Sequence, residues 1–485
     1  MLFNSLDFAI FLPITFIIYW FLTQRNLRVQ NTFIVISSYI FYGWWDWRFL
    51  SLIIFSTVVD YSIGQKLKTE TKQSKRKILL WLSIIVNLGF LGFFKYYNFF
   101  LENFVDAFSL FGVKLNTSSL NIILPVGISF YTFQTLSYTI DVYKKKLDPT
   151  KDFIAFSAFV CFFPQLVAGP IERATNLLPQ FYKLRKFNYE KAVDGLRQML
   201  WGLFKKVVIA DNCAEYANQI FNNSADMNGS TLVVGAIFFT FQIYGDFSGY
   251  SDIAIGTSRL FGFDLKQNFA TPYFSRDIAE FWRRWHISLS TWFRDYLYIP
   301  LGGSRGGTWM KVRNTFVIFL VSGFWHGANW TFLVWGVINA LYFLPLLLTN
   351  NNRINTNVVA EEKLLPSIKE FSSMMFTFFL TVFAWIFFRA ENISHAADII
   401  IEICSYSIIC IPDFDNRHIA FYHMLFILLF LIIEWIGRSG KHSLENLMIL
   451  KPRVYRYVLY VLLSVSIINE LVSSSKSQEF IYFQF

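Results

Sequence analysis

The recurrence of long apolar runs limits most strongly what this chain can fold into. A transmembrane helix needs about 20 mostly apolar residues to cross a hydrocarbon core roughly 30 Å thick. Some runs are shorter than one span and others are long enough to be broken or doubled, so we predict about eleven transmembrane helices. The alternating apolar and polar decamers of a membrane β-barrel are missing from the sequence. The chain is therefore predicted to be an all-α polytopic membrane protein. The apolar runs cover residues 8–22, 32–45, 49–63, 78–100, 121–143, 153–169, 231–263, 314–348, 371–390, 397–411, 419–437 and 453–472.

The composition supports this class and excludes several functions. With 54% hydrophobic residues and 57 Phe, the chain carries more apolar surface than a soluble domain hides. The net charge of +10 is typical of positive-inside topology, so we expect membrane lipids and no nucleic acid as partners. The four cysteines lie in or beside apolar runs without CxxC spacing, so we predict no disulfide framework or zinc site. We likewise expect no other metal and no bound cofactor.

Basic loops indicate the orientation of the chain. The runs 25–28, 66–77 and 438–456 are basic and are expected in the cytoplasm, which places both termini outside. The first helix lacks a basic flank and a cleavage site, so it is expected to be retained. Counting does not resolve residues 144–313, where we expect short helices that lie at the interface or enter the membrane without crossing it. No repeat or long linker divides the sequence, so we predict one domain, residues 1–485.

Three segments contain polar residues that lipid disfavours. The hydroxyls and amides of 121–143 indicate either interhelical hydrogen bonds or a tunnel wall. The lysines and arginines of 189–212 favour an interfacial helix, with an anionic ligand as the alternative. Asp246 and Asp252 lie in the apolar segment 231–263 and need partners, either at a functional site or in an ion pair with Arg259 or Arg276. Glycines 245, 249 and 256 share one face of that segment and predict the close approach of another helix.

The stretch 275–330 holds two of the six histidines, each beside a tryptophan. Asp277 and Glu280 have the spacing of a capping box that opens a helix at Ile278, and the apolar periodicity continues that helix past His286. His286 then falls on the aromatic face, whereas Arg283 and Arg284 fall on another. The glycine-rich loop that follows, around Arg305, is too short and irregular for a P-loop.

His326 lies in the sequence GFWHGANW, where we predict a glycine-lined break in the apolar run 314–348. The small residues there allow backbone or substrate to come close. An imidazole can take and return a proton near pH 7. A buried histidine also packs in many cores, so the residues alone leave catalysis and packing open for both histidines. No zinc HExxH or GxSxG motif accompanies them.

The same stretch resembles the membrane-bound O-acyltransferase (MBOAT) family. Within it, the bacterial branch that contains the alginate O-acetyltransferase membrane subunit is most similar. The branch that D-alanylates teichoic acids shares the RWH and WHG elements, but LYIPLGGSRGG and the C-terminal FIYFQF fit the acetylase branch better. The resemblance covers nearly the whole chain. It is carried by FWRRWHISLSTWFRDYLYIPLGG (281–303), FWHGANWTFLVWG (324–336), PVGISFYTFQTLSYTIDVY (125–143), FFPQLVAGPIER (162–173), YGDFSGYSDIAIG (244–256) and FIYFQF (480–485).

This resemblance implies the MBOAT fold, with helices around a central tunnel in the bacterial cytoplasmic membrane. It implies transfer of an acetyl group from cytoplasmic acetyl-CoA, a co-substrate, to an extracytoplasmic polysaccharide. His326 matches the family's active-site histidine and is expected to act as general base, with His286 orienting or stabilising the reacting groups. The further substrate or CoA-binding candidates are Arg283, Arg284, Arg305, Trp285, Trp325, Asn329, Asp246 and Asp252, and Lys311 is a further CoA-phosphate candidate.

The polar loops here are too small to hold a long glycan, so we expect a separate partner. The resemblance implies that this partner is an SGNH-type extracytoplasmic protein. D-alanyl or another acyl transfer to a cell-wall polymer is the alternative within the family. A glycan transporter or flippase is the alternative from another class, and it predicts inverted-topology repeats that the sequence does not show.

Overall fold

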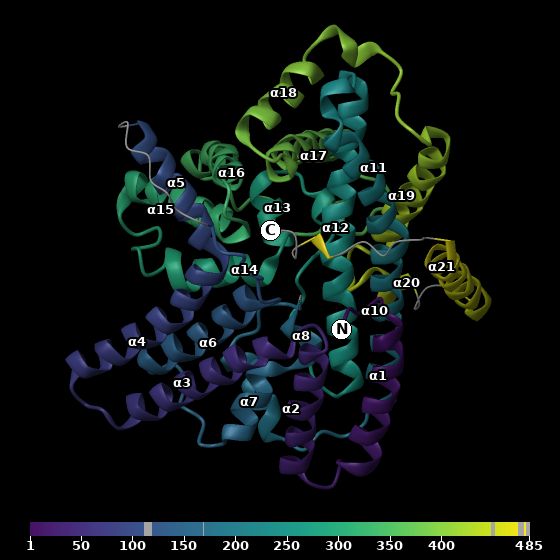
Figure 1. Ribbon diagram of the computed structural model, residues 1–485. Helices are drawn as coiled ribbons and strands as arrows, with labels where there is room; N and C mark the ends of the chain where they lie inside the picture. Colours follow the sequence, from purple (N-terminus) through teal and green to yellow (C-terminus); the bar gives the residue numbers. More distant parts are fainter. Residues whose placement is uncertain (111–118, 168, 448–451, 474–479, 482–485) are drawn as a thin grey trace. The chain divides into compact units, whose positions relative to one another are not determined.

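The computed structural model describes residues 1–110, 119–167, 169–447, 452–473 and 480–481, and the regular structure in these ranges is helical (Figure 1). A helix satisfies its own backbone hydrogen bonds, which hydrocarbon requires of any spanning segment. The predicted all-α membrane class is therefore confirmed, and this is a multi-pass membrane protein. The count of about eleven spans stays a prediction. Six described helices are long and apolar enough to span: 73–110, 229–260, 330–348, 368–389, 417–437 and 453–472.

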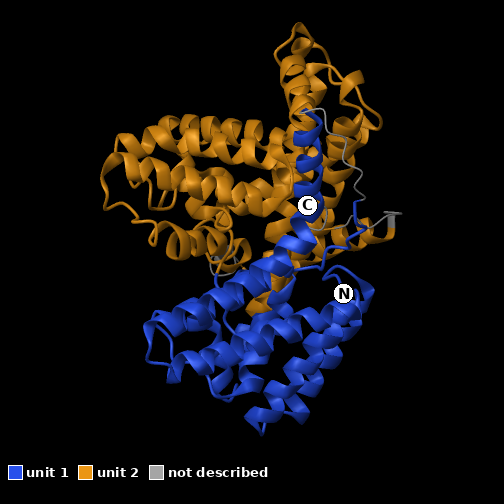
Figure 2. Ribbon diagram, turned by 60° about the vertical axis from the view of Figure 1, so that its left-hand side comes forward, with its two compact units in different colours: residues 1–193, 257–266 blue, residues 194–256, 267–485 orange. Residues whose placement is uncertain are grey.

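The chain forms two compact units (Figure 2). Unit 1 comprises residues 1–193 and 257–266, and unit 2 comprises residues 194–256 and 267–485. Helices α10 (Tyr189–Leu203) and α12 (Gly229–Leu260) each contribute residues to both units. Two sequence blocks behind the family resemblance are incomplete in the structure, because Ala168 and residues 482–485 lie outside the described ranges.

In unit 1, the polar segment 121–143 forms α6 (Ile128–Tyr143) and hydrogen-bonds to neighbouring helices. Gly127 precedes α6 with φ +73°, and a Cβ there would come within 2.7 Å of the Leu166 carbonyl oxygen. Along α6, Gln134 donates to the Phe159 carbonyl, and Thr135 donates to Asn87 Oδ1 at 3.0 Å. These contacts favour interhelical hydrogen bonding for segment 121–143. The elements of unit 1 before α10 are α1 (Leu6–Ile17), η1 (Ile18–Leu22), α2 (Leu27–Gly43), η2 (Trp47–Phe49), α3 (Leu50–Thr69), α4 (Gln73–Leu91), η3 (Gly92–Tyr96), α5 (Tyr97–Leu110), α6 (Ile128–Tyr143), α7 (Phe153–Cys161), α8 (Phe163–Leu166), α9 (Ala174–Leu177) and η4 (Leu178–Tyr182).

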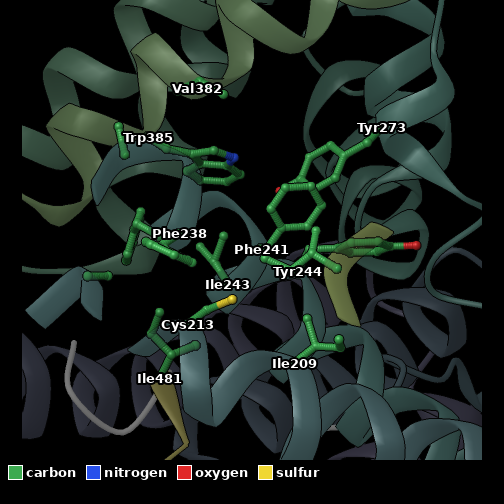
Figure 3. Close-up of a cluster of buried hydrophobic side chains, with 14 of the residues drawn as sticks. Ile209, Cys213, Phe238, Phe241, Ile243, Tyr244, Tyr273, Val382, Trp385 and Ile481 are labelled. Carbon is green, nitrogen blue, oxygen red and sulfur yellow. The ribbon is translucent and has the colours of Figure 1, made fainter. Parts of the chain in front are cut away.

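Unit 2 holds both histidines of the sequence motif and a large aromatic core. Figure 3 shows part of this core, where Tyr273 meets Tyr244 and Phe241 with ring centroids 4.9 and 5.9 Å apart. Besides α10 and α12, the elements of unit 2 are η5 (Phe204–Ala210), α11 (Asp211–Asn222), η6 (Ser224–Asp226), η7 (Pro272–Phe274), α13 (Ile278–Arg284), α14 (Ile287–Phe293), η8 (Arg294–Tyr298), α15 (Gly307–His326), α16 (Trp330–Leu348), α17 (Ile368–Arg389), α18 (Ile393–Ile403), η9 (Tyr406–Ile409), α19 (Arg417–Gly437), α20 (Ser443–Leu447) and α21 (Arg453–Ser473).

Glycines bring the helices of unit 2 into backbone contact, as predicted for the small-residue face of α12. A Cβ on Gly249 would come within 2.8 Å of the Gly202 carbonyl oxygen, and one on Gly245 within 2.9 Å of the Lys205 carbonyl oxygen. Between α15 and α16, a Cβ on Gly323 would come within 2.2 Å of the Phe332 carbonyl oxygen. The predicted approach of another helix to α12 is therefore confirmed, with α10 and η5 as its neighbours. The backbones of α15 and α16 are also in contact.

Candidate functional site

His286 lies at a break between α13 and α14, with φ +44° and ψ +53°. The capping by Asp277 is confirmed, since its side chain accepts from the Glu280 amide at 2.7 Å. The continuous helix predicted past His286 was wrong. The loop before α13 prevents it, because the Ile287 amide donates to the Asn268 carbonyl at 2.9 Å. Such left-handed backbone at a non-glycine residue persists only where surrounding contacts hold it.

Asn268 fixes the tautomer of His286. Its Oδ1 accepts from the Ser288 amide at 3.2 Å and from the Ser288 hydroxyl at 2.8 Å, and its Nδ2 donates to Ser251 Oγ at 3.1 Å. The atom facing His286 Nδ1 at 3.1 Å is therefore an acceptor, so Nδ1 carries the proton and donates. His286 Nε2 consequently holds a lone pair, and this buried nitrogen has no hydrogen-bond partner among the described residues.

The surroundings of His286 keep it neutral. The side chain is 1% exposed, and burial lowers the pKa of its imidazole to about 3. The Phe247 ring meets it edge-on with centroids 4.6 Å apart, and the Phe269 ring lies parallel at 6.3 Å. A neutral imidazole with one open lone pair accepts a hydrogen bond or a proton and cannot donate from that atom.

Trp325 brings the two histidines to one place in unit 2. Its ring centroid lies 5.9 Å from that of His286 and 4.9 Å from that of His326. His326 also contacts Trp335 and Phe388, each at 5.2 Å between centroids. The fold therefore places both predicted histidines against the same indole, although forty positions separate them in the sequence.

His326 is the last residue of α15 and is 3% exposed. The helix ends because Gly327 is extended, with φ −166°, and a Cβ at Gly327 would come within 2.0 Å of the Phe332 ring. Asn329 then caps α16, since its side chain accepts from the Thr331 amide at 3.0 Å and donates to the Glu391 carbonyl at 2.7 Å. The predicted break around His326 is confirmed, and the contacts of Asn329 are those of a helix cap.

The arginines predicted to meet CoA hold a loop in unit 2. Arg283 donates to the carbonyls of Asn352 and Asn355 at 2.8 and 2.6 Å. Arg284 donates to the Asn357 carbonyl and pairs with Glu280, each at 2.9 Å. Arg305 is exposed in the turn before α15. The first two guanidiniums thus fasten residues 352–357 to α13.

Trp285 belongs to the aromatic core of unit 2. It is 1% exposed and stacks on Phe281, with centroids 5.5 Å apart. It also contacts Trp385 at 5.2 Å and Phe269 at 5.1 Å. Because Phe269 in turn contacts His286, Trp285 supports the wall behind this histidine.

The acids of α12 pair with lysines of η5. Lys206 lies 2.8 Å from Asp246, and Lys205 lies 2.6 Å from Asp252. The ion-pair alternative is therefore confirmed with other partners, because lysines of η5 stand where Arg259 or Arg276 was expected. Both lysines are buried, 0% and 3% exposed, and the interfacial placement of segment 189–212 stays a prediction. Close packing at the α12 glycines brings the lysines to the acids. Although burial opposes the charged form, Asp246 and Asp211 raise the pKa of Lys206 above its usual range.

Two features beside the histidines were not predicted from the sequence. Asn268 has no motif that separates it from an ordinary loop residue, so only its contacts reveal it. A small polar cavity is also lined by Lys205, Glu434, Lys441 and Phe269, with further lining residues from α12 and α19. Phe269 forms a wall of this cavity and stacks against His286. Among the described residues, no group of three or more His, Cys, Asp or Glu side chains is arranged to hold a metal ion.

Asn268→Asp is expected to change the pH dependence of any reaction that uses the lone pair of His286. An aspartate would accept from His286 Nδ1 and keep the tautomer, but its charge would raise the pKa of His286 from about 3 toward neutral pH. Activity should then fall as the pH drops through this raised pKa, because protonation of His286 removes the Nε2 lone pair. Asn268→Leu should instead lower kcat without this acid limb, because it removes the acceptor that holds the proton on His286 Nδ1. The measurement is the pH profile of kcat.

Asn339→Asp is the control for a new buried acid, since Asn339 hydrogen-bonds within its own helix to the Trp335 carbonyl. An unchanged acid limb in folded Asn268→Asp protein would contradict the assigned role of Asn268.

Comparisons with known proteins identify the family of the chain. The sequence profile of the membrane-bound O-acyltransferase family matches residues 144–388, which include both histidines. The probable alginate O-acetylase AlgI of Pseudomonas aeruginosa is 40% identical over 400 residues, covering 82% of this chain and 73% of that protein. The peptidoglycan O-acetyltransferase of Helicobacter pylori is 35% identical over 429 residues, covering 82% and 79%. The teichoic acid D-alanyltransferase of Streptococcus thermophilus is 29% identical over 271 residues, covering 50% and 62%. This chain belongs to the membrane-bound O-acyltransferase family.

Proposed function

We propose that the chain is an O-acetyltransferase that moves an acetyl group from cytoplasmic acetyl-CoA to an extracytoplasmic, alginate-like polysaccharide. The observation that carries the proposal is the pair of buried histidines on Trp325, one of them with an open Nε2 lone pair. Relatives named alginate O-acetylase and peptidoglycan O-acetyltransferase support the acetyl group and a glycan acceptor. The D-alanyltransferase relative covers less of the chain at lower identity, so D-alanyl transfer is the weaker alternative.

In the proposed reaction, an acceptor hydroxyl attacks the thioester carbonyl and the carbon–sulfur bond breaks. His326 takes the hydroxyl proton and returns it to the departing thiolate, which leaves as free CoA thiol. His286 accepts a hydrogen bond at Nε2 and so orients the incoming group. Because Nε2 carries no proton, it cannot donate a hydrogen bond to an oxyanion. We therefore propose that His286 either orients the incoming group or accepts its proton.

The donor is proposed to come from the cytoplasmic side through a central tunnel. Lys441 belongs to the basic run 438–456, which is predicted to be cytoplasmic, and it lines the cavity that Phe269 also lines. Arg305 and Lys311 remain candidates for the CoA phosphates, whereas Arg283 and Arg284 are proposed to shape the site through the loop that they hold. Asp252 keeps Lys205 in place in the wall of this cavity, and Asp246 holds the neighbouring Lys206.

We further propose that residues 1–485 act as one domain in the bacterial cytoplasmic membrane. An SGNH-type extracytoplasmic protein is the proposed partner, which would receive the acetyl group and pass it to the polymer. Co-purification in mild detergent tests the partner, and full activity of the chain alone on polymer would count against it.

Radiolabelled acetyl-CoA tests the donor directly. Purified chain in proteoliposomes should release free CoA and move the label to an acceptor, because the site removes a proton from a hydroxyl and returns one to sulfur. A transporter or flippase, the other class consistent with a multi-pass membrane protein, would give no acetyl-CoA turnover. His286→Ala is the matched negative control. Turnover at the same rate in this variant would show that His286 has no role in the proposed reaction.

A further inference from the structure

A buried carboxylate in unit 1 lies far along the chain from the histidines and has no role in the proposed reaction. Asp60 of α3 is 0% exposed. It accepts from Thr139 of α6 at 3.0 Å, from Asn87 of α4 at 2.8 Å and from the hydroxyl of Ser83, also on α4. Three helices therefore converge on one carboxyl group.

A second layer of polar side chains surrounds this contact. Asn87 Oδ1 accepts from Ser56 of α3 at 2.9 Å and from Thr135 of α6 at 3.0 Å. All of these side chains are at most 1% exposed. We call this set the Asp60 cluster; it comprises Ser56, Asp60, Ser83, Asn87, Thr135 and Thr139.

The cluster supplies hydrogen bonds but no positive charge. Among the residues that the structure describes, no lysine, arginine or histidine pairs with Asp60. The other membrane acids described above differ, because Asp246 and Asp252 each meet a lysine within 2.8 Å. A charge in hydrocarbon is tolerated when it is paired or neutralised. The charged form of Asp60 therefore requires a positive charge, and no side chain in the described ranges supplies one.

The titratable groups around Asp60 do not supply this positive charge either. Tyr138 of α6 interacts electrostatically with Asp60 and is neutral or negative. Asp141 of α6 and Cys161 of α7 bring no positive charge. Arg76 of α4 is directed elsewhere, since it donates to the carbonyls of Leu67 and Tyr143.

The oxygen atoms of the cluster suit a small hard cation. One carboxylate, four hydroxyls and one amide oxygen come from three helices, and such ligands favour ions that prefer oxygen. A divalent ion would leave one uncompensated charge in the bilayer, whereas one monovalent charge makes the site neutral.

We propose that the Asp60 cluster binds one monovalent cation, either a proton on the carboxyl group or a sodium ion among its oxygens. Neutralisation of Asp60 fastens α3, α4 and α6 together. A species that binds the folded state alone stabilises it in proportion to the logarithm of its concentration, so the unfolding temperature should depend on sodium or on pH.

The experiment follows thermal unfolding of the full chain in detergent by tryptophan fluorescence. One arm raises NaCl against choline chloride at constant ionic strength, and the other lowers the pH from 8.5 to 5.5 without sodium. A sodium site should raise the unfolding temperature by about 2 °C or more with NaCl alone, and a proton site should raise it similarly as pH falls. Protonation stabilises here because the folded state takes up the proton, so this gain is lost as pH rises.

Asp60→Asn should abolish the response, because it removes the charge at nearly constant size. Asp148→Asn, at an exposed aspartate of the same unit, should respond as the unsubstituted chain does. Equal responses in Asp60→Asn and the unsubstituted chain, or no response in either, would overturn the proposal.

Thr139→Val provides a second test, which applies if Asp60→Asn does not fold. Loss of this hydroxyl should move a sodium midpoint to a several-fold higher concentration. It should move a proton midpoint to higher pH, because the hydroxyl favours the charged carboxylate. Midpoints unchanged in Thr139→Val would also overturn the site. None of these readings depends on acyl transfer, so they are independent of the proposed function.

Discussion

His326→Ala is expected to abolish acetyl transfer while the protein still folds and inserts. General acid–base catalysis by a positioned side chain contributes about 10²- to 10⁴-fold, so kcat should fall by that range. The loss should appear in kcat more than in KM, because the proton moves in the transition state. The measurement is acetyl-CoA turnover by the variant beside its elution profile and unfolding temperature.

His418→Ala is the matched control, since His418 is exposed on α19. It should keep full activity. Because His326 packs against Trp335 and Phe388, alanine leaves a void, and the unfolding temperature separates that effect from catalysis. Folded His326→Ala protein with normal turnover would refute the proposed base.

Lys206→Met is expected to have the largest effect on stability. Removal of the lysine leaves Asp246, which is 2% exposed, without its counter-charge. Breaking a buried ion pair by removing one partner typically costs about 3–5 kcal/mol of unfolding free energy. Thermal unfolding in detergent should show a large drop, and less folded protein should be recovered from membranes.

A second substitution separates charge from packing. Lys206→Met with Asp246→Asn should recover part of the loss, since asparagine is neutral and its oxygen can still accept from the Ile481 amide, which donates to Asp246 at 2.7 Å. Lys191→Met is the control, because its pair with Asp264 is largely exposed and such pairs contribute little. A Lys206→Met protein as stable as this control would show that the buried pair does not hold η5 to α12.

The sequence predicted local features well. Apolar runs about one bilayer long indicated membrane helices, and the cap at Asp277 and the break after His326 were both correct. The predicted helix past His286 failed because the hydrogen bond from the Ile287 amide to Asn268 comes from a loop outside the periodic pattern. Periodicity reports the preference of a segment in isolation, and a tertiary contact overrode it here.

The sequence by itself determined the membrane class, the glycine face of α12, the family and the two histidines, because each depends on composition or on residues close together in the chain. Only the tertiary structure decided that both histidines meet at Trp325, that Asn268 sets the tautomer of His286, and that Lys205 and Lys206 are the partners of the α12 acids. The Asp60 cluster was likewise decided by the packing of three helices. The physical reason is that a polar side chain buried in a membrane protein must find a partner, and the packing of distant segments chooses which one.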